Sequence, residues 1–132
     1  MSKFYICRHC GNIVEMVKDA RVTPLCCGQK MDLLEPNTVE ASGEKHLPAV
    51  EVNGDLVTVK VGSVEHPMTE EHSIQWVQLE TAHGVQRRVL APNEAPNEAP
   101  NEAPKAVFAL NGDKPVAVYA YCNLHGLWKT EL

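Results

Sequence analysis

In the stretch CNLHGLW near the C-terminus, Cys122 and His125 place a thiol and an imidazole three residues apart in a tight polar turn. Three further histidines stand upstream in short polar contexts: His46, His66 and His72. One cysteine with four histidines is an unusual set for zinc, which takes four ligands in tetrahedral geometry. Five such ligands suit iron better. A five-coordinate iron keeps one face open, and that face is where chemistry can happen.

Four more cysteines form a second candidate metal site near the N-terminus. Cys7 and Cys10 have the CxxC spacing, in which a two-residue spacer lets a tight turn aim both sulfurs at one ion. Cys26 and Cys27 are adjacent, so we expect them to share that ion only with angles strained away from a regular tetrahedron. Zinc ribbons generally repeat CxxC at the second knuckle, which disfavours an ordinary zinc finger. With four cysteines present, we interpret His9 as a solvated spacer.

Length and composition limit the classes of protein. The 132 residues, 44% of them hydrophobic, give room for one modest core and a small appendage. A net charge of −5 argues against a nucleic-acid partner. No apolar run approaches the roughly 20 residues that span a bilayer, and the first residues lack the apolar stretch of a secretory signal. We therefore expect a cytoplasmic protein without a membrane partner, whose reduced cysteines bind metal.

The elements that must position these ligands fall into two parts, with a boundary expected near residue 36. Residues 1–36 contain a short strand at 13–17 and are too few to bury a core, so metal must hold them together. In residues 37–132 the alternation of Val57, Val59 and Val61 is typical of a half-buried strand. Further strands are expected at 74–81, 85–90, 107–110 and 116–122. Short strands with turn signals, and no helix longer than a couple of turns, predict a β-sandwich.

Two segments have no assigned chemistry. His83 lies in the predicted hairpin turn 82–84, and we interpret it as a surface residue. Residues 91–104 repeat Ala-Pro-Asn-Glu, with a proline at every fourth position, which bars both strand pairing and a helix. We expect this repeat to be an exposed, extended loop between two strands.

The two parts together resemble desulfoferrodoxin, the two-iron form of superoxide reductase. The N-terminal knuckles are similar to a desulforedoxin domain, and the remainder is similar to a neelaredoxin-type, immunoglobulin-like β-sandwich. The resemblance is carried by the CxxC and CC knuckles, by EKHLP at 44–48, by VEHPM at 64–68, by His72 with the Ile74-x-Trp76 that follows, and by CNLHGLW at 122–128. It covers nearly the whole chain, and the repeat at 91–104 is its one departure.

The resemblance implies two iron ions per chain. One would be an FeS4 centre held by Cys7, Cys10, Cys26 and Cys27. The catalytic iron would have four histidines in its equatorial plane and a cysteine in the axial position: His46, His66, His72, His125 and Cys122. Trp76 and Trp128 would pack near this metal.

Two charged residues would act at the open face. Glu44 would occupy the sixth position after oxidation, and Lys45 would supply positive charge that offsets the acidic protein. The activity implied is that of an oxidoreductase, in which superoxide takes one electron and two protons and leaves as hydrogen peroxide. A donor protein such as rubredoxin would supply the electrons, and the family also implies a homodimer.

Three other functions compete with this hypothesis. A pure electron carrier would need neither an open position nor Lys45. A zinc-binding interaction module would lack the visible colour of ferric thiolate centres. A superoxide dismutase would turn over without an external reductant.

Overall fold

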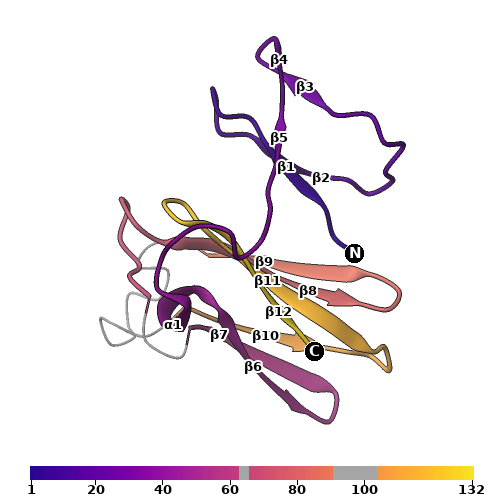
Figure 1. Cartoon of the computed structure of the whole chain (residues 1–132). Helices are drawn as coiled ribbons and strands as arrows, with labels where there is room; N and C mark the ends of the chain where they lie inside the picture. The colour runs from indigo at the N-terminus through magenta and orange to yellow at the C-terminus, as the bar shows by residue number, and fades with distance from the viewer. Residues whose placement is uncertain (63–65, 91–103) are drawn as a thin grey trace. The chain divides into compact units, whose positions relative to one another are not determined.

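The computed structural model describes residues 1–62, 66–90 and 104–132, which form two compact units, Met1–Glu35 and Pro36–Leu132 (Figure 1). Nearly all regular structure is β-strand, and the helix in the described residues is α1 (Gly43–His46), a single turn. In the described part of the chain, no helix is long and apolar enough to cross a membrane.

The first unit is built from very short strands. β1 (Phe4–Ile6) pairs with β2 (Ile13–Glu15) on one side and β5 (Asp32–Leu33) on the other, all antiparallel. β3 (Leu25–Cys26) and β4 (Gln29–Lys30) make a separate two-residue hairpin. A small buried cluster is made of Tyr5, Cys7 and Met31, with Met16 and Cys26 against it, and Phe4, Ile6 and Leu34 are also buried. So little apolar burial cannot offset chain entropy alone, and metal must add stability.

The second unit consists of two antiparallel sheets. One has the order β10-β7-β6, from β6 (Pro48–Asn53), β7 (Leu56–Val61) and β10 (Lys105–Ala109). The other has the order β12-β11-β8-β9, from β8 (Ile74–Thr81), β9 (Val85–Val89), β11 (Pro115–Cys122) and β12 (Gly126–Glu131). Inward side chains of both sheets, such as Val59, Leu79, Phe108 and Val118, share one apolar core. The prediction of a mainly β chain, with a small knuckle domain and an immunoglobulin-like sandwich, is confirmed.

Several strands were predicted almost to the residue, and others were missed. The structure has strands at β8, β9, β10 and β11 where period-two alternation and turn signals indicate them. β6 and β12 were not predicted, because most of β6 is exposed and β12 mixes glycine and charge with its apolar residues. The expected loop at 91–104 falls outside the described residues, apart from Pro104.

Antiparallel pairing gathers the ligand-bearing segments at one end of the second unit. Cys122 at the end of β11 pairs with Ile74 at the start of β8, two residues after His72. The Thr130 hydroxyl of β12 donates to the Pro48 carbonyl, 2.7 Å away, at the start of β6. Helix α1, which ends at His46, leads into β6 after Leu47.

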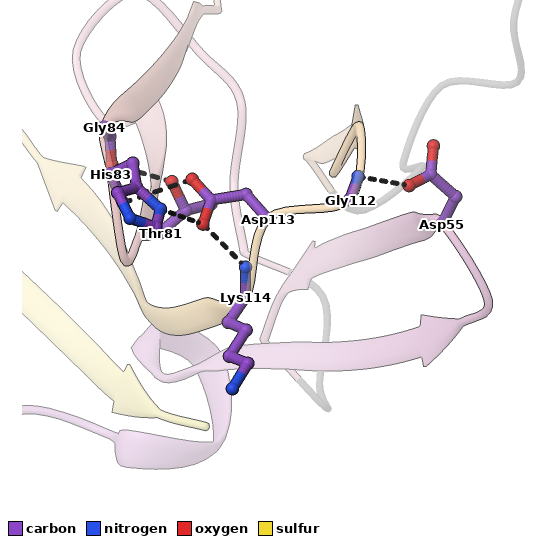
Figure 2. Close-up of polar contacts among 7 residues, drawn as sticks. All are labelled: Asp55, Thr81, His83, Gly84, Gly112, Asp113 and Lys114. Carbon is purple, nitrogen blue, oxygen red and sulfur yellow. Dashed lines mark hydrogen bonds and ion pairs between the residues drawn. The ribbon is translucent and has the colours of Figure 1, made fainter.

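Polar contacts join the turns at the other end of the strands (Figure 2). The Asp113 carboxylate accepts hydrogen bonds from the backbone N–H of His83 at 3.1 Å, from the His83 ring at 2.9 Å and from the Lys114 N–H at 2.8 Å. The Asp55 carboxylate accepts one from the Gly112 N–H at 3.2 Å. Above all, the side-chain hydrogen bond from His83 holds the pKa of Asp113 below its usual range. The His83 side chain is 87% exposed, as expected.

Asp113→Asn should therefore destabilise the second unit at neutral pH. A carboxyl group with a lowered folded-state pKa contributes stability above its unfolded pKa of about 3.9, and this contribution is lost as pH falls. The difference in melting temperature between wild type and variant should be fully present near neutral pH and should shrink as the pH falls below about 5. Thermal denaturation followed by circular dichroism measures it. Glu51→Gln, at an exposed carboxylate on β6, is the control, and an equal, pH-independent loss in both variants would contradict the prediction.

Candidate metal centres

The four N-terminal cysteines converge on one point. Their sulfur atoms all lie within 4.8 Å of one another, although Cys10 and Cys27 are exposed and Cys7 is buried. The sulfur of Cys26 is 3.6 Å from that of Cys10 and 3.9 Å from that of Cys27. In a tetrahedral site with metal–sulfur bonds of about 2.3 Å, the sulfurs are about 3.8 Å apart. The cluster therefore fits a tetrahedral thiolate centre, which is called the four-cysteine centre below.

Backbone geometry allows the adjacent cysteines to face the same point. Cys27 has a φ of 53° and Gly28 a φ of 73°, so the chain passes through two left-handed residues. A left-handed conformation is rare for a residue with a Cβ atom, and here it redirects the second side chain. The adjacent cysteines are thus accommodated by an unusual backbone conformation at Cys27 and Gly28, and not by strained angles at the sulfur atoms as we expected.

The thiols also show why a cation is required. The backbone N–H of Cys10, with smaller contributions from neighbouring groups, lowers the pKa of Cys7 to about 6. The side chains of Cys10, Cys7 and Cys26, in that order, raise the pKa of Cys27 to about 12. Four thiolates this close repel one another, and only a bound cation can hold them all ionised.

The second group of ligands comes from three segments around the end of the sandwich. It contains His46, His66, His72, Cys122 and His125, whose ligand atoms also lie within 4.8 Å of one another. These residues are buried or half-buried, and Cys122 is fully buried. The structure thus brings together all five residues that the sequence singled out, and they are called the His4Cys site below.

A glycine allows the turn that carries His46 to pack closely. A Cβ atom at Gly62 would meet the Glu44 carbonyl oxygen, the Lys45 carbonyl carbon at 2.9 Å and the Leu47 carbonyl oxygen at 3.0 Å. The end of β7 therefore lies directly against the backbone of α1. Gly62 was not predicted as a site residue from the sequence, although a glycine ending an alternating strand is a signal for close backbone approach.

The loops that carry His72 and Cys122 are held by local hydrogen bonds. Thr69 and His72 close a tight turn, in which the Thr69 N–H donates to the His72 carbonyl at 2.9 Å and the His72 N–H to the Thr69 hydroxyl at 3.1 Å. The Trp128 ring N–H donates to the His125 carbonyl at 3.1 Å, and the Trp128 ring stacks on His46 with centroids 4.9 Å apart. Trp128 therefore packs beside the site, whereas Trp76 stacks on Tyr121.

The four imidazoles form a square. Ring centroids are 4.6 Å apart for His46 and His66, 4.6 Å for His66 and His72, 5.0 Å for His72 and His125, and 4.8 Å for His125 and His46. His46 and His72 are 6.4 Å apart and so lie across the diagonal. The Cys122 sulfur is 3.8 Å from the His125 Nδ1.

The spacing of the ligand atoms fits a metal ion inside this square. The His46 Nε2 is 3.0 Å from the His125 Nδ1 and 3.1 Å from the His66 Nε2. Ligands at right angles, with metal–nitrogen bonds of about 2.1 Å, are about 3.0 Å apart. The His72 Nε2 is buried without a hydrogen-bond partner, which is costly unless a cation binds there.

Outer hydrogen bonds and burial prepare the histidines for metal. The Nδ1–H of His46 donates to the Ser42 carbonyl and that of His66 to the Pro67 carbonyl, each at 2.7 Å, which leaves both Nε2 lone pairs facing inward. Burial is the main cause that lowers the pKa of His46 and His72, and it lowers that of His66 to about 4. These three imidazoles are therefore neutral near pH 7, as metal ligation requires.

The thiol of the fifth ligand is also prepared for ionisation. Burial raises the pKa of Cys122, while hydrogen bonds from the backbone N–H groups of His125 and Leu124 oppose this rise. Those donors favour the thiolate once a cation is bound.

Glu44 and Lys45 both lie on α1 and are exposed, directly before the buried His46. The positive charge of Lys45 is one of the smaller causes that lower the pKa of His46 and His72. Lys45 therefore acts electrostatically on the histidine square.

Comparisons with known proteins agree with this geometry. The sequence profile described as Desulfoferrodoxin matches residues 38–131, and the profile described as Desulfoferrodoxin, N-terminal domain, matches residues 1–34. The chain belongs to the desulfoferrodoxin family. Members of this family have one metal centre with four cysteine ligands and another with four histidines and one cysteine. Both ligand groups are present here, so the chain has the ligands for two iron ions.

Individual relatives cover between two thirds and nearly all of the chain. A desulfoferrodoxin from Syntrophotalea carbinolica is 45% identical over 127 residues, covering 96% of this chain and 94% of the relative. A superoxide reductase from Thermococcus kodakarensis is 40% identical over 100 residues, covering 68% of this chain and 87% of the relative. The crystal structure of the superoxide reductase from Treponema pallidum matches with a TM-score of 0.78 and 37% identity, covering 99% of each chain.

Gly62→Ala should displace the turn that carries His46. Because the added methyl group meets backbone atoms, which cannot rotate away, we expect a loss of about 1–3 kcal/mol of stability and weaker metal retention at the His4Cys site. Iron content and thermal denaturation measure the two effects. Gly84→Ala is the matched control, since a Cβ atom there meets nothing within 4 Å. Full metal retention in Gly62→Ala would show that α1 can move without cost.

Proposed function

We propose that this chain is a superoxide reductase, which reduces superoxide to hydrogen peroxide at the His4Cys site. The observation that carries the proposal is the square of four imidazoles with one cysteine sulfur beside it. These four histidines and one cysteine would offer five ligand atoms, which would leave room for a sixth ligand on a bound iron ion. A small molecule such as superoxide can approach there.

The ligand types suit the reaction. His46, His66, His72, Cys122 and His125 would hold an iron ion, which in its ferrous state would supply the single electron that superoxide accepts. Neutral imidazoles add no negative charge, so the site attracts a small anion. The Cys122 thiolate donates electron density, as axial cysteine does in haem enzymes. Two protons complete the product, so each superoxide consumes one electron and two protons.

We assign distinct roles to the two charged residues of α1. Lys45 would attract the anion to a protein whose net charge is −5, and its charge already acts on two ligand histidines. Glu44 would offer a carboxylate oxygen, a hard ligand suited to the ferric state, and would close the site until an electron returns. Both residues precede His46 on one turn, which supports a common place of action.

The wider setting is also part of the proposal. The four-cysteine centre would serve electron transfer or structure, with electrons arriving from a donor protein such as rubredoxin. A cytoplasmic location is supported by five free cysteines in the described chain, which suit a reducing compartment. A homodimer is proposed from the family resemblance.

The proposal can be tested with two variants that separate the centres. All four ligands of the four-cysteine centre lie in Met1–Glu35, and all five of the other group lie in Pro36–Leu132. After chemical reduction, Cys10→Ser should lose the spectrum of the four-cysteine centre but still convert one superoxide per ferrous iron. Cys122→Ser should keep that spectrum and lose the reaction. Pulse radiolysis with a hydrogen peroxide assay measures both.

Other products would point to the competing functions. Release of dioxygen in equal amount to peroxide would indicate a dismutase. Failure of the reduced wild-type protein to consume superoxide would indicate an electron carrier. Loss of the first turnover in Cys10→Ser, with its His4Cys spectrum intact, would give the four-cysteine centre a direct catalytic part.

Lys45→Ala should slow the capture of superoxide and weaken its dependence on ionic strength. For a charge roughly 10 Å from the anion, Coulomb's law gives a loss between about 2-fold at the dielectric constant of water and about 17-fold at an effective value of about 20. The iron spectrum should not change, because lysine is not a ligand. Pulse radiolysis over a range of salt concentrations measures the effect.

Lys114→Ala is the matched control, since it removes the same charge from an exposed lysine at the other end of the sandwich. Lys45→Arg should keep most of the rate. Equal rates for Lys45→Ala and Lys114→Ala would refute local attraction by Lys45.

A further inference from the structure

Asn123 joins two of the loops that carry metal ligands. Its side-chain N–H donates to the Glu71 carbonyl at 2.8 Å, and its side-chain oxygen accepts from the Ser73 N–H at 2.9 Å. Its backbone N–H donates to the Ser73 carbonyl at 3.2 Å. These contacts bracket His72, while Asn123 itself directly follows Cys122. One residue thus touches both sides of one ligand and is bonded to another.

His72 needs such support more than two of the other histidines. In the described part of the chain, backbone carbonyls fix the rings of His46 and His66, whereas the buried Nε2 of His72 has no hydrogen-bond partner. The direction of its Nε2 is therefore set by its backbone. The Nε2 atom is buried and has no hydrogen-bond partner. A small rotation of the ring would therefore point this atom away from a bound metal without exposing it to water.

Thr69 and Asn123 both hold the backbone around His72, but they fix different features of it. Thr69 bonds the N–H and the carbonyl of His72, but it lies three residues away and fixes only the shape of its own turn. Asn123 is about fifty positions away, so its contacts fix where this turn lies relative to Cys122 and His125. The placement of His72 in the square thus depends on Asn123.

We propose that Asn123 is a positioning residue for the His4Cys metal site, which holds His72 at the correct place relative to Cys122 and His125. This inference rests on the proposed function in one respect, which is that the five residues of the His4Cys site bind one metal ion. It does not depend on which reaction the site performs.

Asn123→Asp is the sharpest test. Aspartate has the same size and keeps the acceptor for the Ser73 N–H, but it places a negative oxygen against the Glu71 carbonyl. Loss of an outer partner of a metal ligand typically weakens metal binding about 10- to 100-fold, and we expect a loss of this order. Competition between the holoprotein and a ferrous chelator measures it, followed by the ferric thiolate absorption of the His4Cys site. The four-cysteine centre of the same molecule is an internal reference for folding.

Asn37 provides a matched control. Its side chain donates to the Lys129 carbonyl at 3.1 Å and accepts from the Lys129 N–H at 2.9 Å, the same pair of bond types on β12, but it flanks no ligand. Asn37→Asp should lower thermal stability as Asn123→Asp does and leave iron retention unchanged. The thiolate absorption of Asn123→Asp should also shift in energy, which a general loss of stability would not cause.

Equal weakening of iron retention in the two variants, or wild-type retention in Asn123→Asp, would overturn the proposal. If Asn123→Asp does not fold, Asn123→Ser decides, because its short hydroxyl side chain cannot bridge both backbone groups. In that case, normal iron retention in Asn123→Ser would overturn the proposal that Asn123 positions His72. The readout needs no superoxide, so a failure of the proposed reaction and a failure of this inference give different results.

Discussion

Lone pairs from five side chains converge on one point from which most water is excluded, and this constraint governs the second unit. The His46 Nε2 lies 3.0 Å from the His125 Nδ1 and 3.1 Å from the His66 Nε2, and the His72 Nε2 has no hydrogen-bond partner among the residues that the structure describes. Without a cation, such an arrangement combines lone-pair repulsion with the cost of desolvation. The apolar core and the two sheets must hold the ligands in place, and metal binding then repays this cost.

The sandwich meets this demand by placing the ligands where strands begin and end. His46 lies next to the start of β6, His72 next to the start of β8, and Cys122 at the end of β11. Strand positions are fixed by a fully buried core that includes Val59, Leu79 and Val118, so the ligands inherit this rigidity. The exposed residues that we assign to substrate attraction, by contrast, lie on the single turn of α1.

The ligand residues could be predicted from the sequence, whereas the groups that orient and position these ligands could not. Cysteine and histidine have a metal chemistry that spacing and family resemblance can reveal, and alternation of valines marks a strand such as β7. The Ser42 and Pro67 carbonyls that orient His46 and His66 are backbone groups, which leave no trace in residue type. Gly62 and Asn123 are common residues whose roles depend on contacts with segments distant in the sequence, so only the folded structure shows them.

Polar side chains take over where the sheet ladder becomes irregular. Between Tyr121 and Cys122 the pairing of β11 with β8 shifts register, so regular pairing with β8 does not fix the segment that follows. Asn123 extends the pairing by one backbone bond and then supplies a side-chain amide, which offers a donor and an acceptor as a peptide group does. The chain turns here in the hairpin loop between β11 and β12, which the Cys122–Gly126 pair closes, and the Asn123 amide ties this loop to the loop that carries His72. The irregular end of the sheet is thus what allows a β-sandwich to surround an ion.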